Sequence, residues 1–190
     1  RPVSAEGETT GTETSGHLRR EAPAKAFLQA NTGAASLLYG HIRRYAEREQ
    51  PGTVWDLYCG VGGMALFLAG DGVTVRGVES VHEAVRYARK NAASLGGDIV
   101  FFKGDAGMTG IDVSPAPDLV ITDPPRAGMA KELVETLLKL RPPRIIAVSC
   151  DAASLARDVA LLAPAYRLKS ARAVDLFPHT PHVEIVSLLE

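Results

Sequence analysis

Apolar runs and helix-like stretches alternate along most of the chain. Short, nearly continuous apolar runs are typical of strands buried on both faces, whereas apolar residues three and four positions apart indicate amphipathic helices. The runs that predict strands cover residues 53–59, 74–79, 98–103, 118–123, 144–150, 167–176 and 183–189. The stretches that predict helices cover residues 34–48, 64–69, 82–93, 130–140 and 153–162. Strands that alternate with helices predict an α/β fold with a mostly parallel sheet covered on both faces.

The last two predicted strands are separated only by the short segment F-P-H-T-P-H. A parallel crossover needs a dozen or more residues, so these two strands must pair antiparallel. A doubly wound sheet that ends in an antiparallel C-terminal hairpin resembles the Rossmann-like sheet of class I methyltransferases that depend on S-adenosyl-L-methionine. We therefore expect one such catalytic domain over residues 23–190.

Residues 1–22 are polar, rich in Gly, Thr and Glu, and without hydrophobic period. This composition predicts a flexible N-terminal segment. The first residue is Arg rather than Met, from which we expect the chain to be part of a longer protein.

Charge and cysteine content limit the partners of the chain. The formal net charge is −1, so any nucleic-acid contact must come from a local patch or from a further module. Cys59 and Cys150 are far apart and lack metal-ligand spacing. No apolar run reaches membrane-spanning length and no signal peptide is visible. We expect a cytoplasmic monomer with neither membrane nor metal partners.

Candidate ligand-binding residues follow the predicted strands, at the carboxyl ends where α/β sheets bind ligands. The first strand runs into the glycine-rich stretch 56–63 (D-L-Y-C-G-V-G-G), where the backbone can approach a ligand closely. Glu79 ends the second strand, at a spacing that suits a ribose diol. Asp105 follows the third strand, and D-P-P-R, with Asp123 and Arg126, ends the fourth.

Two cofactors compete for this edge of the sheet. G-V-G-G-M-A also fits the dinucleotide fingerprint G-x-G-x-x-A, which alone is a weak match. Asp56, just before the loop, suits the cationic amino group of a methionine moiety and would repel a pyrophosphate. Asp105 would suit an adenine amino group. Each acid could merely cap a strand end, but four in series favour a ligand site, and we expect S-adenosyl-L-methionine rather than NAD.

Cys150 lies where a strand passes into a helix. A lone cysteine is commonly a small buried hydrophobe, but a thiol at such a junction also lies where a thiolate is stabilised. Thiolate addition to C6 of a pyrimidine makes C5 electron-rich enough to take a methyl group. The adduct then needs a base for the C5 proton, and the stretch 177–184 offers His179, His182 and Glu184.

Four motifs occur in a fixed order: L-Y-C-G-V-G-G, D-P-P-R-A-G, V-S-C-D-A-A-S-L-A-R-D and F-P-H-T-P-H-V-E. Together they resemble the RNA 5-methyluridine methyltransferases, the uracil-C5 family that acts on tRNA and rRNA. F-L-Q-A-N at 27–31 is similar to the family's F-x-Q-x-N element, so the resemblance covers 27–190. It implies an RNA methyltransferase that uses S-adenosyl-L-methionine.

The resemblance also implies roles for single residues. Cys150 would be the nucleophile and Glu184 the base. Cofactor contacts are implied at Gln29, Tyr58, Gly63, Glu79, Asp105 and Asp123, to which the strand-end pattern adds Asp56, Gly60 and Gly62. Asp123 would lie where cofactor and target base meet, and we expect Arg126 to help position the nucleotide. His179 and His182 would shape the surroundings of the base.

The chain departs from the family pattern at three places. Asp151-Ala152 follow the cysteine where the family often has Asn-Pro, and we expect the Asp151 anion to oppose thiolate formation. Gly63 stands where Asn is common. The family's N-terminal RNA-binding region, and the iron–sulfur cysteine set of some members, have no counterpart in these residues.

Other functions remain open at this stage. The chain could be a cofactor-binding fragment that is inactive on RNA without an RNA-binding domain, because a near-neutral chain has little charge with which to hold a phosphate backbone. An amino methyltransferase of nucleic acid is disfavoured, since Arg126 replaces the aromatic residue that often follows D-P-P. A cytosine-C5 methyltransferase is disfavoured because the motif lacks a cysteine.

Overall fold

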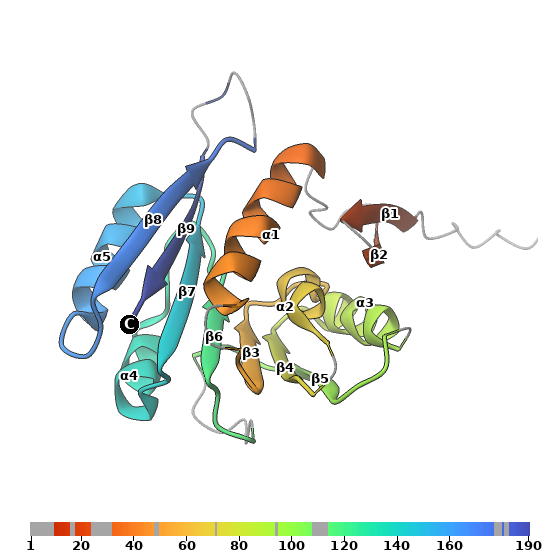
Figure 1. The fold of residues 1–190 in the computed structure, drawn as a ribbon, viewed down its shortest axis with the longest axis horizontal. Helices are drawn as coiled ribbons and strands as arrows, with labels where there is room; N and C mark the ends of the chain where they lie inside the picture. Colours follow the sequence, from red (N-terminus) through yellow and green to blue (C-terminus); the bar gives the residue numbers. More distant parts are fainter. Residues whose placement is uncertain are drawn as a thin grey trace, which may run out of the picture.

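A seven-stranded sheet forms the centre of the fold in the computed structural model (Figure 1). The structure describes residues 10–15, 18–23, 32–47, 50–70, 72–93, 95–107, 114–176, 180 and 183–190. The strand order is β5-β4-β3-β6-β7-β9-β8. The strands are β3 (Thr53–Leu57), β4 (Thr74–Glu79), β5 (Ile99–Lys103), β6 (Leu119–Thr122), β7 (Arg144–Ser149), β8 (Leu168–Val174) and β9 (Glu184–Leu189).

Strands β3 to β7 are parallel, and β9 is inserted antiparallel between β7 and β8. The predicted α/β class and the antiparallel C-terminal pair are thereby confirmed. The insertion of β9 between β7 and β8 was not predicted, because spacing along the chain limits the direction of a strand but not its neighbours.

Helices cover both faces of the sheet (Figure 1). The helices are α1 (Thr32–Glu47), α2 (Gly63–Leu68), α3 (His82–Ala92), α4 (Lys131–Leu140) and α5 (Ala152–Leu162). Side chains of α1, α2 and α3 pack on one face of the sheet, and those of α4 and α5 pack on the other. None of the helices in the described ranges has both the length and the apolar content needed to cross a membrane.

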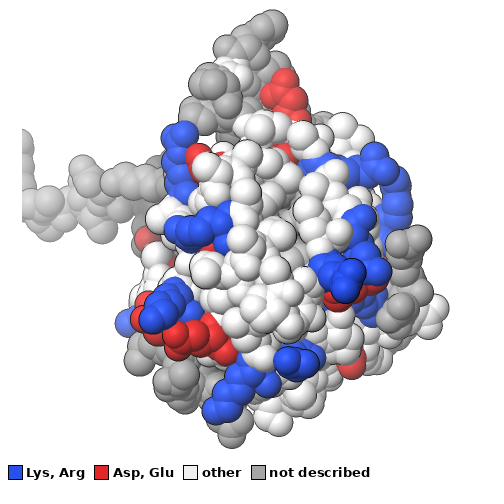
Figure 2. Space-filling view, turned by 90° about the vertical axis from the view of Figure 1, so that its left-hand side faces the viewer, with Lys and Arg blue, Asp and Glu red and all other residues white. Residues whose placement is uncertain are grey.

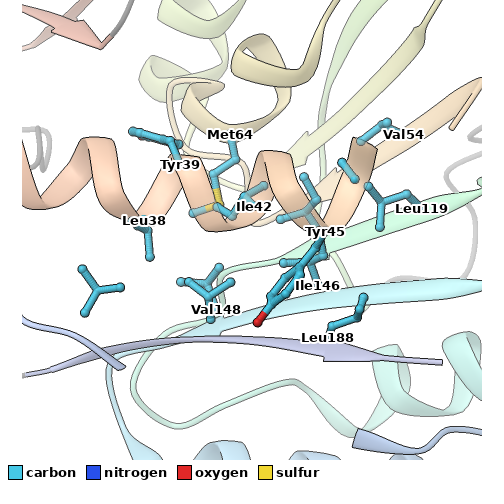
Figure 3. Close-up of a cluster of buried hydrophobic side chains, with 14 of the residues drawn as sticks. Leu38, Tyr39, Ile42, Tyr45, Val54, Met64, Leu119, Ile146, Val148 and Leu188 are labelled. Atoms are coloured by element: carbon cyan, nitrogen blue, oxygen red, sulfur yellow. The ribbon is translucent and has the colours of Figure 1, made fainter. Parts of the chain in front are cut away.

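The largest buried cluster joins α1 to the middle of the sheet (Figure 3). Leu38, Ile42 and Tyr45 recur at helical spacing and therefore lie on one side of α1. They meet Ile146 and Leu188, from β7 and β9, on the facing side of the sheet. Burial of this stripe holds α1 beside the strands that end at the candidate site.

A two-stranded hairpin lies within residues 10–23, most of which belong to the segment 1–22 that the sequence predicts to be flexible. Strands β1 (Thr10–Ser15) and β2 (Leu18–Pro23) pair antiparallel, from Thr10 opposite Pro23 to Ser15 opposite Leu18. Thr recurs at alternate positions in β1, and a β-branched residue at that period favours an extended chain. The prediction for 1–22 gave weight to polar composition and missed this period.

Candidate active site

The carboxyl ends of the parallel strands meet at one edge of the sheet, which brings the predicted site residues together. Glu79 ends β4, Asp123 directly follows β6 and Cys150 directly follows β7. Because β9 runs antiparallel, its first residue, Glu184, lies at the same edge. The predicted nucleophile and base are thus on neighbouring strands.

The register of β7 and β9 places Cys150 beside Glu184. Ser149 at the end of β7 is opposite Ile185 of β9. Cys150, the residue after Ser149, and Glu184, the residue before Ile185, therefore lie side by side where the pairing ends. Neighbouring strands are about 4.8 Å apart. The Cys150 thiol is only partly buried. Burial raises its pKa, and the negative charges of Glu184 and Asp123 raise it further.

Two carboxyl groups next to this thiol have unusual protonation. Burial, with a smaller contribution from Asp123, raises the pKa of Glu184 to about 7. Burial raises the pKa of Asp123 to about 6. A carboxylate whose pKa lies near neutrality can take up and release protons at physiological pH. Glu184 can therefore take up and release a proton near neutral pH.

The glycine-rich loop is tied to the end of β4. Glu79 accepts a hydrogen bond from the backbone N–H of Gly60 at 3.0 Å, and its other oxygen accepts one from Val81 N–H at 2.8 Å. Gly62 has φ 84°, and a Cβ there would come within 2.8 Å of the Phe101 ring. A side chain at this position would thus strain the backbone and displace the ring. The loop needs glycine to approach the sheet so closely.

Asp56 is buried beneath this loop and is 1% exposed. Its Oδ2 accepts a hydrogen bond from Ala65 N–H in α2 at 3.0 Å, but its Oδ1 has no hydrogen-bond partner in the part of the chain that the structure describes. Burial raises the pKa of Asp56 to about 8, and nearby Asp123 and Glu79 contribute to the rise. The site therefore holds a buried acceptor that a cationic group would satisfy.

The remaining predicted cofactor residues lie around the same edge. Tyr58 has φ 64°, and its hydroxyl accepts a hydrogen bond from Ala130 N–H at 3.4 Å. Asp105 follows β5 and accepts one from Gly107 N–H at 2.9 Å. Gly63 is the first residue of α2. Gln29, His179 and His182 lie outside the described residues.

Asp151 does not act on the thiol as the sequence suggests. Its Oδ1 caps α5 by accepting a hydrogen bond from Ser154 N–H at 2.8 Å, and its Oδ2 lies 3.6 Å from Arg126 Nε. The carboxylates that raise the pKa of Cys150 are Glu184 and Asp123, whereas Arg126 lowers it. The expected opposition from Asp151 is therefore corrected: its charge is engaged by the helix and by Arg126.

Sequence reasoning missed a buried clamp on the D-P-P-R loop. Asp158 of α5 is 2% exposed and accepts hydrogen bonds from Met129 N–H at 2.8 Å and from the Arg157 guanidinium at 2.6 Å. A Cβ on Gly128 would meet Asp158 Oδ2 at 2.6 Å, so only glycine fits here. Asp158 is the last residue of the motif V-S-C-D-A-A-S-L-A-R-D at 148–158, but only the fold shows which loop its side chain holds.

These features define a methyltransferase domain: the chain belongs to the methyltransferase small domain family, whose model matches residues 30–143. The family model for tRNA (Uracil-5-)-methyltransferase matches residues 107–190, which include the D-P-P-R, V-S-C-D and H-V-E motifs. The resemblance to the RNA uracil-C5 methyltransferases is thereby confirmed.

Individual relatives agree with this assignment. The chain is 46% identical to an uncharacterized RNA methyltransferase of Nitratidesulfovibrio vulgaris, over 98% of this chain and 42% of the relative. It is 36% identical to the 23S rRNA (uracil(747)-C(5))-methyltransferase RlmC of Yersinia pseudotuberculosis, over 87% of this chain and 44% of that protein.

A solved structure supports the same family. The tRNA (uracil-54, C5)-methyltransferase of Pyrococcus abyssi, in complex with S-adenosyl-L-homocysteine, is 34% identical, with a TM-score of 0.84 over 97% of this chain and 45% of that chain. The present chain thus spans less than half the length of each of these three proteins.

Proposed function

We propose that this chain is the catalytic domain of an S-adenosyl-L-methionine-dependent methyltransferase that forms 5-methyluridine in tRNA or rRNA through a covalent adduct on Cys150. The observation that carries the proposal is the placement of Cys150 beside Glu184, at the sheet edge that also holds Asp123. A nucleophile and a base at adjacent strand ends are what addition to C6 and proton removal from C5 require.

The residues present fit the cofactor. The unpartnered Oδ1 of buried Asp56 suits the cationic amino group of its methionine moiety. Glu79 ends β4 and Asp105 follows the adjacent strand β5, where they would hold the ribose and the adenine. Tyr58 and the loop glycines Gly60, Gly62 and Gly63 would line the same side. The cofactor supplies the methyl group that C5 takes. The tRNA (uracil-54, C5)-methyltransferase of similar structure holds the demethylated form of this cofactor.

Cys150 begins the reaction as a thiolate. Its sulfur would form a bond to C6, and the electron pair of the C5–C6 double bond would form the new bond from C5 to the methyl carbon, whose bond to the cofactor sulfur would break to leave S-adenosyl-L-homocysteine. Because burial and two carboxylates raise the thiol pKa, only a small fraction is ionised in the free protein near neutral pH. The nearby positive charge of Arg126 acts in the opposite direction and favours the thiolate.

Glu184 completes the reaction. Its carboxylate takes the proton from C5, the C–H electron pair restores the C5–C6 double bond, and the C6–S bond breaks to release the thiolate. With a pKa raised to about 7, Glu184 is a stronger base than an ordinary carboxylate and is still substantially ionised at neutral pH. Asp123 and Arg126 flank this point and would position the nucleotide.

Trapping with a fluorinated substrate tests this proposal. The chain is incubated with the cofactor and a short RNA that contains 5-fluorouridine. The RNA is single-stranded, so the target base does not have to be extruded from a duplex. Fluorine replaces the hydrogen on C5, so Glu184 has no C5 proton to remove and the adduct persists. Mass spectrometry should locate the adduct on Cys150. Cys150→Ser should form none, whereas Cys59→Ser should form as much as the wild type. A modified Cys59, or no adduct with a well-bound cofactor, would contradict the mechanism.

A second candidate is a domain that binds the cofactor but turns over folded RNA poorly. Two observations favour this candidate. The chain spans less than half the length of these relatives, and its net charge of −1 gives it little charge with which to hold RNA. Calorimetry with the cofactor and methylation assays on single-stranded and folded RNA separate the two. If the second candidate is correct, the chain should bind the cofactor normally but methylate folded RNA only slightly. Rapid methylation of folded tRNA by this chain would exclude it.

A further inference from the structure

A cluster of basic side chains joins α1 to the edge strand β8. Tyr45 Oη lies 2.7 Å from Ser170 Oγ, which fixes where the helix meets the strand. His41 lies one helical turn before Tyr45, and Arg172 lies two residues after Ser170 on the same face of β8. The contact at Tyr45 thus brings His41 and Arg172 together, and Arg44 lies on the adjoining part of α1.

Electrostatics agree with this geometry. Burial lowers the pKa of His41, and the positive charges of Arg44 and Arg172 lower it further, so both guanidinium groups lie near the imidazole. Both arginines are exposed. We call His41, Arg44 and Arg172 the α1–β8 basic cluster.

Among the described residues, neighbouring cations are paired with carboxylates, whereas the two arginines of this cluster are not. Arg43 lies 3.6 Å from Glu47, and Lys169 lies 3.6 Å from Glu190. No carboxylate within the described ranges pairs with Arg44 or Arg172. Figure 2 shows Lys and Arg side chains spread around the face on which β8 and α5 lie, with acidic side chains beside several of them. An unneutralised cluster in a chain of net charge −1 is a local patch that would attract an anion.

The cluster is close to the candidate active site. Val174 of β8 is opposite Glu184, and Arg172 is opposite Val186 of β9. Two residues along a strand span about 7 Å. Strand β9 also separates β8 from β7, which adds about 9.6 Å across the sheet, so Arg172 lies about 12 Å from the end of β7, a length of about three to four stacked nucleotides. A strand whose uracil is at Cys150 could therefore extend its backbone to Arg172.

We propose that the α1–β8 basic cluster binds backbone phosphates of the RNA strand that flanks the target uridine. The inference rests on the proposed function, which makes RNA the substrate. Guanidinium groups match the geometry of phosphate oxygens, and a phosphate would satisfy both arginines. Phosphate contacts carry no sequence information, so the cluster would hold any RNA in register without selecting the uridine.

Salt-dependent RNA binding tests the proposal. Fluorescence anisotropy with a labelled 12-nucleotide single-stranded RNA is recorded at several salt concentrations for the wild-type chain and for Arg44→Gln, Arg172→Gln and the double variant. Arg43→Gln is the matched control, since it removes the same charge one position away, from a residue that is paired with Glu47. Calorimetry with S-adenosyl-L-methionine on each variant reports separately on the cofactor site.

Each cluster substitution should weaken RNA binding by about threefold, equally for RNAs of different sequence, and reduce the slope of log affinity against log salt by about 0.7. Arg43→Gln should leave both quantities unchanged. Wild-type affinity and slope in the double variant, or no RNA binding by the wild type at low salt, would overturn the inference. Weakened RNA binding without any cofactor binding would support the cluster and count against the proposed function.

Discussion

Cys150 and Glu184 leave the paired region of β7 and β9 side by side, although they are far apart in the sequence. The carboxyl group raises the pKa of the thiol, and burial raises the pKa of the carboxyl to about 7. The charge of Glu184 therefore affects the proton affinity of the Cys150 thiol. This coupling can be measured without RNA or cofactor.

Glu184→Gln should lower the pKa of the Cys150 thiol. Of the two carboxylates that disfavour the thiolate, Glu184 has the larger effect, and this substitution removes its charge. Alkylation by iodoacetamide, recorded against pH and located by mass spectrometry, should reach half-maximal rate at a lower pH than in the wild type. A Cys59→Ser background removes the second thiol, which is buried. An unchanged midpoint would show that the two groups do not interact.

The same substitution should have a different effect on catalysis. Without a base for the C5 proton, the methylated adduct should accumulate on Cys150, and release of 5-methyluridine should slow by about 10²- to 10⁴-fold. Gel mobility under denaturing conditions, with ordinary uridine RNA and cofactor, would show the adduct. Glu135→Gln, on the surface of α4, is the control and should turn over normally. Free turnover by Glu184→Gln would assign the base to another group.

Cofactor binding should strengthen as pH rises from about 6 to 7.5. In the free protein the pKa of Asp56 is raised to about 8, so its carboxyl is largely protonated in this range. A cationic ligand favours the ionised form and lowers that pKa, so binding releases a proton and affinity rises by up to about tenfold per pH unit. Calorimetry in buffers of different ionisation enthalpy would measure the number of protons released when the cofactor binds. Asp56→Asn should bind more weakly and without this pH dependence.

Asp158→Ala should destabilise the fold by about 1–3 kcal/mol, because Met129 N–H loses a buried acceptor and Arg157 loses its carboxylate. Urea denaturation measures the change. Glu135→Ala, which removes an exposed carboxylate, should cost less than about 0.5 kcal/mol. Equal losses in the two variants would argue against a specific role for the clamp on the D-P-P-R loop.

The sequence predicts most of the sheet because its signals are local. Strands such as β7, which is buried throughout, appear as continuous apolar runs, and α4 and α5 follow at helical spacing. The carboxyl ends of parallel strands share one edge, so the order of strands along the chain is enough to group Glu79, Asp123 and Cys150. The stretch 177–184 offered Glu184 as one of three candidate bases, and only the motif resemblance singled it out, since its position depends on where β9 inserts.

Other features depend on contacts between distant segments and had no local signal. Asp158 has the sequence neighbourhood of an ordinary helix residue, and only the path of the loop at Gly128 shows why it is buried. Asp151 was expected to oppose the thiolate from its adjacency to Cys150, but the direction of its side chain decides what it acts on. The α1–β8 basic cluster likewise arises from packing and not from a run of basic residues.

The insertion of β9 also orders the assembly of the site in time. Every other strand of the sheet precedes β9 in the chain, and a ribosome delivers residues from the amino end. The glycine loop and the thiol are therefore made before the carboxyl that serves them, and β7 remains an open edge until β9 docks. A nascent domain would thus hold the Cys150 thiol before Glu184 is beside it, and the proposed site would be complete only after one late strand-pairing event.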